Sequence, residues 1–262
     1  MPTAVTIPRT VDAATWVAAK SPALIAVAHG SRDPRSAATM SAVVARIAAA
    51  RPDLTVRLAF LDLNTPSVEQ VVDVVAAQGH THAIVVPLLL GSAFHARVDL
   101  PGILAAAATR QPRLRLTQAD VLGTDARLIA AVRDAVSAEG ADPADERIGI
   151  AVAAVGSSVR DANVRTTTVA RKLGTDTAWQ TTTCFATTEP SLTQAVSRLR
   201  ANGATRILVA PWFLAPGMLT DRLAATDPNL MHAKTIGDHP HLTDVVLDRY
   251  ATAHLTAIGL SA

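Results

Sequence analysis

The segment ALIAVAHGSRDPR, residues 23–35, decides how the rest of the chain is interpreted. Its first six residues, Ala23–Ala28, are all apolar and are followed at once by His29, which predicts a buried parallel strand. A glycine-serine turn comes next, and Asp33 before Pro34 predicts the start of a helix. We therefore expect His29 at the carboxyl end of a strand, where open parallel sheets bind their ligands.

The composition is that of a globular protein with little net charge. Of the 262 residues, 49% are hydrophobic and 18% are charged, which is enough apolar surface for a full core. A net charge of +2 and an aromatic content of 3% argue against nucleic acid as a partner. No apolar run has the length of a membrane span and no export signal is visible, so we expect a cytoplasmic protein with no membrane partner. The single cysteine, Cys184, excludes an internal disulfide framework and is expected to be a buried, inert thiol.

Strand and helix patterns alternate from Ala23 onward. Four strands are predicted in the first half, near residues 23–28, 55–61, 83–89 and 114–119, each with a helix after it. Thr65 and Pro66 are expected to cap and begin the second helix. This alternation implies parallel sheets with right-handed crossovers.

The same order of patterns then occurs a second time. EPSLTQAV from Glu189 matches TPSVEQVV from Thr65, and the loop at 155–160 resembles the loop at 29–34. The fold class is therefore α/β, with two similar three-layer αβα domains that each contain a four-stranded parallel sheet of flavodoxin-like topology. We expect the active-site cleft between them. The predicted divisions are an N-terminal extension at 1–22, a first domain at 23–138, a polar linker at 139–147 and a second domain at 148–262.

Comparison of the two halves indicates one polar site. In the first half His29, Asp62 and His95 follow three successive strands, with 33 residues from each to the next. Adjacent parallel strands bring such residues to one rim of the sheet. The matching positions of the second half are interpreted as Val155, Ala186 and Leu219, all apolar. Two imidazoles and a carboxylate suit a divalent ion such as Fe²⁺, Co²⁺ or Zn²⁺, and the second half would form an apolar wall.

Three segments of the sequence resemble those of a known protein family. VAHGSRDPR (27–35), AFLDLNTPS (59–67) and VVPLLLGSAFHARVDLP (85–101) are similar to the signature segments of the sirohydrochlorin chelatases, the small class II chelatases. The resemblance extends from Ala23 to about Ala253. It implies insertion of Fe²⁺ into sirohydrochlorin to form siroheme, or of Co²⁺ on the way to cobalamin, with the divalent metal as substrate and no organic cofactor.

The resemblance also implies roles for residues. His29 and His95 match the two metal-binding and catalytic histidines of the family. Asp62 stands where many members have glutamate, so a proton-relay or water-mediated role is as compatible with its shorter side chain as direct metal contact.

The substrate is a flat macrocycle with eight carboxylates, which needs an apolar slot with cationic and amide donors at its margins. The slot is expected from Phe94, Met218, Leu219, Trp212 and Phe213. The donors are expected from Gly30, Ser31, Arg32 and Arg97. His80 and His82 precede the third strand, away from this rim, and are expected to be surface residues.

Three classes of function fit parts of the sequence. The first is a sirohydrochlorin ferrochelatase, with the cobaltochelatase as an alternative; iron is preferred because the histidine-rich tail and cysteine motif of some longer cobalt-type members are absent. The second is a two-lobed ligand- or metal-binding protein, which would normally require an export signal. The third is a nucleotide binder, against which the absence of a GxGxxG or GxxxxGK[ST] loop argues. The sequence does not predict the oligomeric state.

Overall fold

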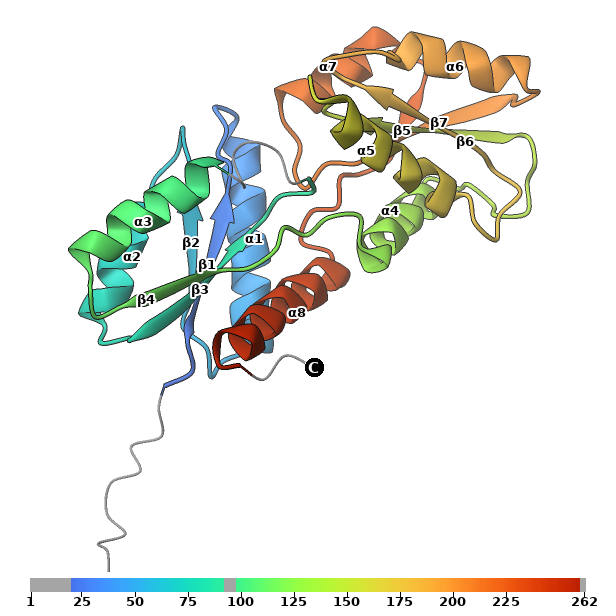
Figure 1. Ribbon diagram of the computed structural model, residues 1–262. Coiled ribbons are helices and arrows are strands. Elements are labelled where there is room, and N and C mark those ends of the chain that lie inside the picture. The colour runs from blue at the N-terminus through green and yellow to red at the C-terminus, as the bar shows by residue number, and fades with distance from the viewer. Residues whose placement is uncertain (1–19, 92–97, 260–262) are drawn as a thin grey trace, which may run out of the picture.

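The fold consists of two four-stranded α/β halves. The computed structural model describes residues 20–91 and 98–259, so the predicted site residues His95, Phe94 and Arg97 lie outside the described residues (Figure 1). The elements of the first half are β1 (Ala23–Ala28), α1 (Pro34–Ala50), β2 (Val56–Phe60), α2 (Val68–Ala77), β3 (His82–Pro87), α3 (Leu100–Arg110), β4 (Arg115–Gln118) and α4 (Ala126–Ala138). Those of the second half are β5 (Ile148–Ala154), α5 (Arg160–Leu173), β6 (Gln180–Phe185), α6 (Leu192–Ala201), β7 (Arg206–Pro211), α7 (Met218–Thr226), β8 (Met231–His232) and α8 (Pro240–Ala257).

Both sheets are parallel and have the same strand order. The first runs β2-β1-β3-β4 and the second β6-β5-β7-β8, which confirms the duplicated α/β fold predicted from the sequence. β1 is completely buried, as its unbroken apolar run indicates. All strand pairs share one direction, so the carboxyl ends of β1, β2 and β3 lie at one edge of the first sheet.

The helix starts follow from local hydrogen bonding. Asp33 caps α1 as predicted, and its carboxylate accepts the Arg35 N–H at 3.0 Å. The predicted cap of α2 at Thr65 is wrong, because α2 begins at Val68 and Ser67 is its N-cap. The Ser67 hydroxyl accepts the Gln70 N–H while the Gln70 side chain accepts the Ser67 N–H, a reciprocal pair that satisfies two backbone donors. Ser191 and Gln194 form the same pair at α6, which supports the duplication.

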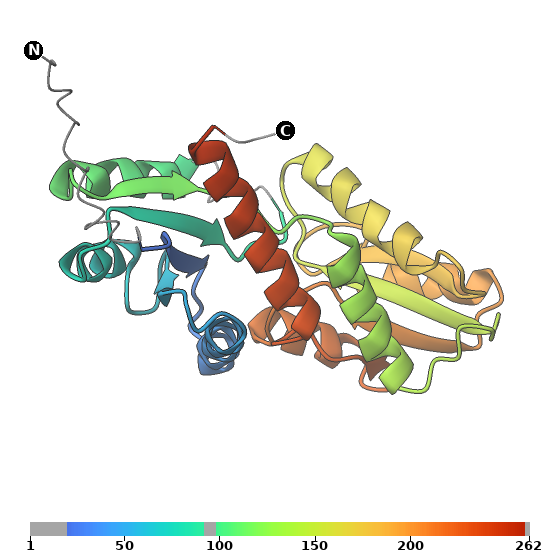
Figure 2. The ribbon, with the colours of Figure 1, turned by 90° about the horizontal axis from the view of Figure 1, so that it is seen from below.

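Two helices are exchanged between the halves. α2 and α3 cover one face of the first sheet, and α1 covers the other together with α8, the last helix of the chain. α4, the last helix of the first repeat, packs instead on α5 and β7 of the second half. Figure 2 shows α8 and α4 beside each other between the two sheets. The linker predicted at 139–147 stays a prediction, and it marks where the sequence pattern begins again. In space the chain passes to the second half earlier, before α4.

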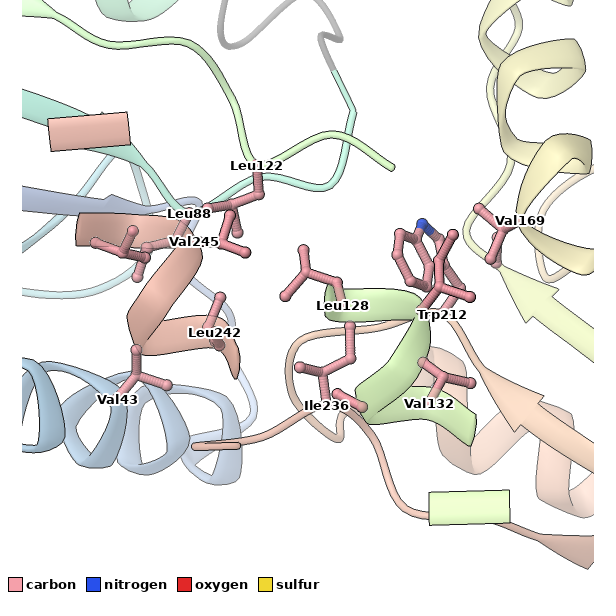
Figure 3. Packing of buried hydrophobic residues seen from close by; sticks show 14 of the residues in the cluster. Val43, Leu88, Leu122, Leu128, Val132, Val169, Trp212, Ile236, Leu242 and Val245 are labelled. Carbon is pink, nitrogen blue, oxygen red and sulfur yellow. The ribbon is translucent and has the colours of Figure 1, made fainter. Parts of the chain in front are cut away.

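The exchange joins the halves through one core. A single hydrophobic cluster contains Val43 of α1, Leu242 of α8, Leu128 of α4 and Trp212, which follows β7 (Figure 3). Trp212 is 4% exposed and packs inside this cluster, and Phe213 is buried in a second cluster under α6 and α7. The expectation that these two rings form part of a substrate slot is thus wrong, because both side chains face the core.

Histidines at the amino end of β3 are also more buried than predicted. His80 is buried and its Nε2 lies 3.1 Å from Thr55 Oγ1, while the half-buried His82 has Nε2 2.9 Å from Thr117 Oγ1. The expectation that they are surface residues is therefore wrong, because β3 is an inner strand and the two rings pack beside Thr55 before β2 and Thr117 of β4. Within residues 20–91 and 98–259, no helix has the length and apolarity needed to cross a membrane.

Candidate functional site

His29 and Asp62 belong to loops that are bonded to each other. His29 directly follows β1, Asp62 follows β2, and both residues are exposed. The His29 carbonyl accepts the Asp62 N–H at 3.0 Å, which extends the pairing of β1 and β2 by one step beyond the strands. Two of the three predicted catalytic residues are thus neighbours on one rim. The third, His95, lies outside the described residues.

Gly30 allows these two loops to approach closely. Its φ is +97°, and a Cβ built on it would lie 1.8 Å from the Asp62 carbonyl oxygen. Any other residue would therefore be strained by its backbone conformation and would collide with the loop that carries Asp62. Glycine is required here for geometry, and the predicted substrate-binding role of Gly30 remains a prediction.

The backbone donors after Gly30 are partly occupied. The Ser31 N–H donates to Asn64 Oδ1 at 2.6 Å, and the Asp33 N–H donates to the Ser31 hydroxyl at 3.0 Å. Asn64 is a residue that the sequence analysis missed, although its place in the loop after β2 is a signal for such a contact. These bonds fix the shape of the rim, and they leave the exposed Arg32 side chain as the cationic donor nearest His29 in sequence.

Backbone pairing corrects one of the predicted counterparts in the second half. The Thr187 N–H donates to the Val155 carbonyl, as the Asp62 N–H does to the His29 carbonyl. Thr187, and not Ala186, is therefore the counterpart of Asp62. The sequence comparison was one residue out because Phe60 bonds to Pro66 whereas Phe185 bonds to Pro190, so the second loop is one residue shorter. The second-half rim keeps a hydroxyl at this position, and only the counterpart of His29, Val155, is confirmed as apolar.

Arg35 connects the rim to the second half. Its guanidinium forms ion pairs with Asp33 in its own loop and with Asp221 in the first turn of α7. A Cβ on Gly217, which precedes α7, would lie 3.9 Å from the Asp33 Cβ. The amino ends of α1 and α7 are therefore in contact, although the sequence analysis gave Arg35 no role.

Hydrogen bonds between Arg35 and its two aspartate partners shift the pKa values of Asp33 and Arg35. The bonds from the Arg35 side chain and backbone hold the pKa of the Asp33 carboxyl below its ordinary value. The bonds to Asp33 and Asp221 raise the pKa of the Arg35 guanidinium. Asp33 and Arg35 are thus both charged at neutral pH.

Apolar side chains are exposed around the same rims. Met218 is 66% exposed and stands next to Gly217, beside the Asp33 loop, while Leu219 is partly buried against the core under α6 and α7. The segments between a strand end and the next helix carry further exposed apolar residues, namely Leu63, Val98, Val155 and Val159. These residues follow strand ends in both halves, and that edge is where open parallel sheets bind their ligands.

Other candidate ligands are excluded or lie outside the described residues. Cys184 is buried as predicted, and burial raises the pKa of its thiol to about 12, so it is no thiolate ligand. Among residues 20–91 and 98–259, no group of three or more His, Cys, Asp or Glu side chains is placed to hold a metal ion. Since His95 is outside these ranges, the predicted pair of imidazoles stays a prediction.

The fold and the rim together define the class. This is a duplicated, two-lobed α/β protein, with an imidazole and a carboxylate on the rim of the first lobe and apolar groups exposed on the rims of both. The chain belongs to the CbiX family, which matches residues 23–139 and 149–253.

Proteins of known activity are similar over nearly the whole chain. Sirohydrochlorin ferrochelatase of Bacillus subtilis is 28% identical over 236 residues, which are 87% of this chain and 90% of that protein. Sirohydrochlorin cobaltochelatase of Priestia megaterium is 26% identical over 240 residues, 85% of this chain and 77% of that protein. The structure of SirB from Bacillus subtilis with Fe³⁺ has a TM-score of 0.76 and 26% identity, and covers 91% of this chain and 97% of that chain.

Proposed function

We propose that this protein is a sirohydrochlorin chelatase, a lyase that inserts Fe²⁺ into sirohydrochlorin to form siroheme and releases two protons. The observation that carries the proposal is the likeness to SirB with Fe³⁺, which covers 91% of the chain at a TM-score of 0.76. The likeness includes both halves, so it concerns the whole two-lobed architecture.

In this proposal His29 and His95 hold the incoming metal and accept the pyrrole protons. Neutral imidazole is a ligand for Fe²⁺ and titrates close to neutral pH, so it can bind the ion loosely and take up a proton. We propose a proton-relay role for Asp62, which the bond between its N–H and the His29 carbonyl supports. Its Oδ1 also accepts the Leu63 N–H at 2.7 Å, which restrains the carboxylate without covering it.

The macrocycle would lie against the apolar groups of the rims. Met218 and Leu219 from α7, with Phe94, supply the slot. Arg32 and Arg97, with the loop at Gly30 and Ser31, bind the peripheral carboxylates. The strong exposure of Met218 supports this assignment, since a side chain of that type gains most by covering an apolar ligand.

A cobaltochelatase activity on the same substrate is the second candidate. It is favoured by the 26% identity to the sirohydrochlorin cobaltochelatase of Priestia megaterium. We further propose that the protein acts in the cytoplasm, which the single, buried cysteine supports.

An anaerobic absorbance assay tests the function. Purified protein is mixed with sirohydrochlorin and either Fe²⁺ or Co²⁺, and the spectral change on metal insertion is followed against the reaction without protein. We expect acceleration with Fe²⁺ that exceeds the acceleration with Co²⁺. Faster insertion of Co²⁺ would reverse the metal preference, and no acceleration with either ion would refute the chelatase assignment.

A further inference from the structure

A cavity lies in the second half of the molecule. It has a volume of about 630 Å³ and lies over β6, the edge strand of the second sheet, between α5 and α6. This volume is typical of sites for small molecules. We refer to it as the β6 cavity; its lining includes Ala170, Arg171, Gly174, Thr181, Thr183 and Arg198. It extends from the residues before β6 to Pro190 in the loop after β6.

The duplication shows what fills this place in the first half. Leu24 pairs with Val56 as Ile150 pairs with Thr181, and Ala26 pairs with Leu58 as Val152 pairs with Thr183. Val56 is buried in the large core cluster and Leu58 packs against it. Two apolar side chains of β2 thus correspond to two threonines of β6.

The helix that packs on β6, α5, also has smaller side chains than its counterpart α1. Val44 and Ala48 pack on the core from α1. Counted from Val155 as these two residues are counted from His29, the counterparts in the second half are Ala170 and Gly174. Alanine replaces valine and glycine replaces alanine, so both side chains are smaller. A Cβ on Gly174 would lie 3.0 Å from Thr181 Cγ2, so the chain is already close there. The cavity therefore results from smaller side chains at equivalent positions and not from a wider spacing of the backbone.

The lining mixes polar and apolar groups, and its charged residues are positive. Thr183 is 5% exposed, and its Oγ1 has no hydrogen-bond partner among the described residues. Arg171 and Arg198 line the cavity from α5 and α6, where the first half has the neutral Ala45 and Val74. No aspartate or glutamate belongs to the lining. The cavity is open to solvent, whereas the Thr183 hydroxyl is buried without a partner. An unpaired buried hydroxyl costs stability, and together with the two arginines it points to a ligand here.

We propose that the β6 cavity binds a small organic polyanion with carboxylate or phosphate groups, with Arg171 and Arg198 as its charge partners and Thr183 as a hydroxyl partner. Guanidinium groups bind both kinds of oxyanion through paired hydrogen bonds. Rotation about χ1 of Thr183 exchanges its methyl and hydroxyl groups and directs Oγ1 into the cavity. This site is independent of metal insertion at the rim.

Titration calorimetry on the full chain tests the proposal with two probes, citrate and pyrophosphate, at matched ionic strength. We expect saturable binding of one of them, which tells whether carboxylate or phosphate is the preferred group. In the double variant Arg171→Gln, Arg198→Gln the affinity should fall at least about tenfold. The control is Arg165→Gln, Arg200→Gln, which removes the same charge from exposed positions on the same helices outside the lining and should retain affinity.

Thr183→Leu restores the side chain of the first half and narrows the cavity beside β6. We expect this variant to lose binding and to unfold at the same or a higher temperature than the parent. Thr183→Val keeps the shape and removes only the hydroxyl, so it should weaken binding and fold normally. The proposal is overturned if neither probe binds at about 10 mM, if both double variants lose affinity equally, or if Thr183→Leu and Thr183→Val both bind like the parent.

Discussion

Arg35, in the first turn of α1, forms an ion pair with Asp221, in the first turn of α7 and 186 residues later in the chain. The pair joins the loop of His29 to the helix that begins with Met218. Both side chains are about half exposed, so the pair adds little to stability, and we infer that it sets the position of α7 over the rim.

Asp221→Asn should therefore affect substrate binding more than folding. Loss of the charge weakens the bridge and lets the apolar residues of α7 move relative to the rim. We expect KM for sirohydrochlorin to rise by about two- to fivefold with little change in kcat. Asp176→Asn, at an exposed aspartate outside the bridge, is the control and should match the parent. A fall in kcat with unchanged KM would contradict this role.

His29→Ala should abolish metal insertion and leave the fold intact. The side chain is exposed at a strand end, so its removal costs little packing, whereas loss of the proposed metal ligand and base should lower kcat at least about 100-fold. His241→Ala, which removes a partly buried histidine of α8, should retain activity. Equal losses in the two variants, or normal turnover by His29→Ala, would show that the rim is not the reaction site.

Gly30→Ala tests the contact between the two loops of the rim. Gly203 has a similar φ of +100°, but a Cβ on it meets no atom within 4 Å, so Gly203→Ala reports the conformational strain alone. We expect Gly203→Ala to cost about 1 kcal/mol and Gly30→Ala about 2–4 kcal/mol, because the latter also displaces Asp62. Urea denaturation measures both. Similar values for the two variants would mean that the loops separate without cost.

The shared core predicts that the halves unfold together. Leu242 of α8 is fully buried against the first half, and Leu242→Ala should cost about 2–5 kcal/mol. Trp179 and Trp212 both belong to the second half and report its unfolding by fluorescence. Their transition should shift together with the circular dichroism signal, while the half-exposed Leu255→Ala shifts neither. An unchanged fluorescence midpoint in Leu242→Ala would show that the halves are energetically separate.

His80 and His82 predict a loss of stability in mild acid. Burial lowers the pKa of both imidazoles below 6.5, helped by Lys20 and Arg57 at His80 and by Arg115 and His254 at His82. As pH falls through 6.5 the unfolded chain takes up protons that the native protein excludes, so the free energy of unfolding decreases.

The temperature at the midpoint of thermal unfolding should therefore decrease as the pH is lowered from about 7 to about 5. This range lies above the one in which ordinary carboxylates titrate. His80→Gln, His82→Gln keeps hydrogen-bonding groups near Thr55 and Thr117 and should flatten this dependence. His241→Gln, at a partly buried histidine of α8, should leave this dependence unchanged. A double variant with the slope of the parent would rule out these groups as its cause.

The sequence by itself determined the elements and their order. Unbroken apolar runs such as Ala23–Ala28 specify buried parallel strands, and an aspartate before a proline specifies the start of α1, because both signals act over a few residues. The duplication could also be recognised from the sequence, since each half repeats the same local signals. These features also placed His29 at a strand end.

Only the tertiary structure decided which surfaces meet. The apolar faces of α4 and α8 specify that each helix is buried but not against which sheet, so the exchange between the halves could not be predicted. Three features depend on distances between segments far apart in the chain. They are the equivalence of Asp62 and Thr187 in the two halves, the ion pair between Arg35 and Asp221, and the β6 cavity. A residue's local pattern fixes its own conformation, whereas its partners are fixed by the packing of the whole molecule.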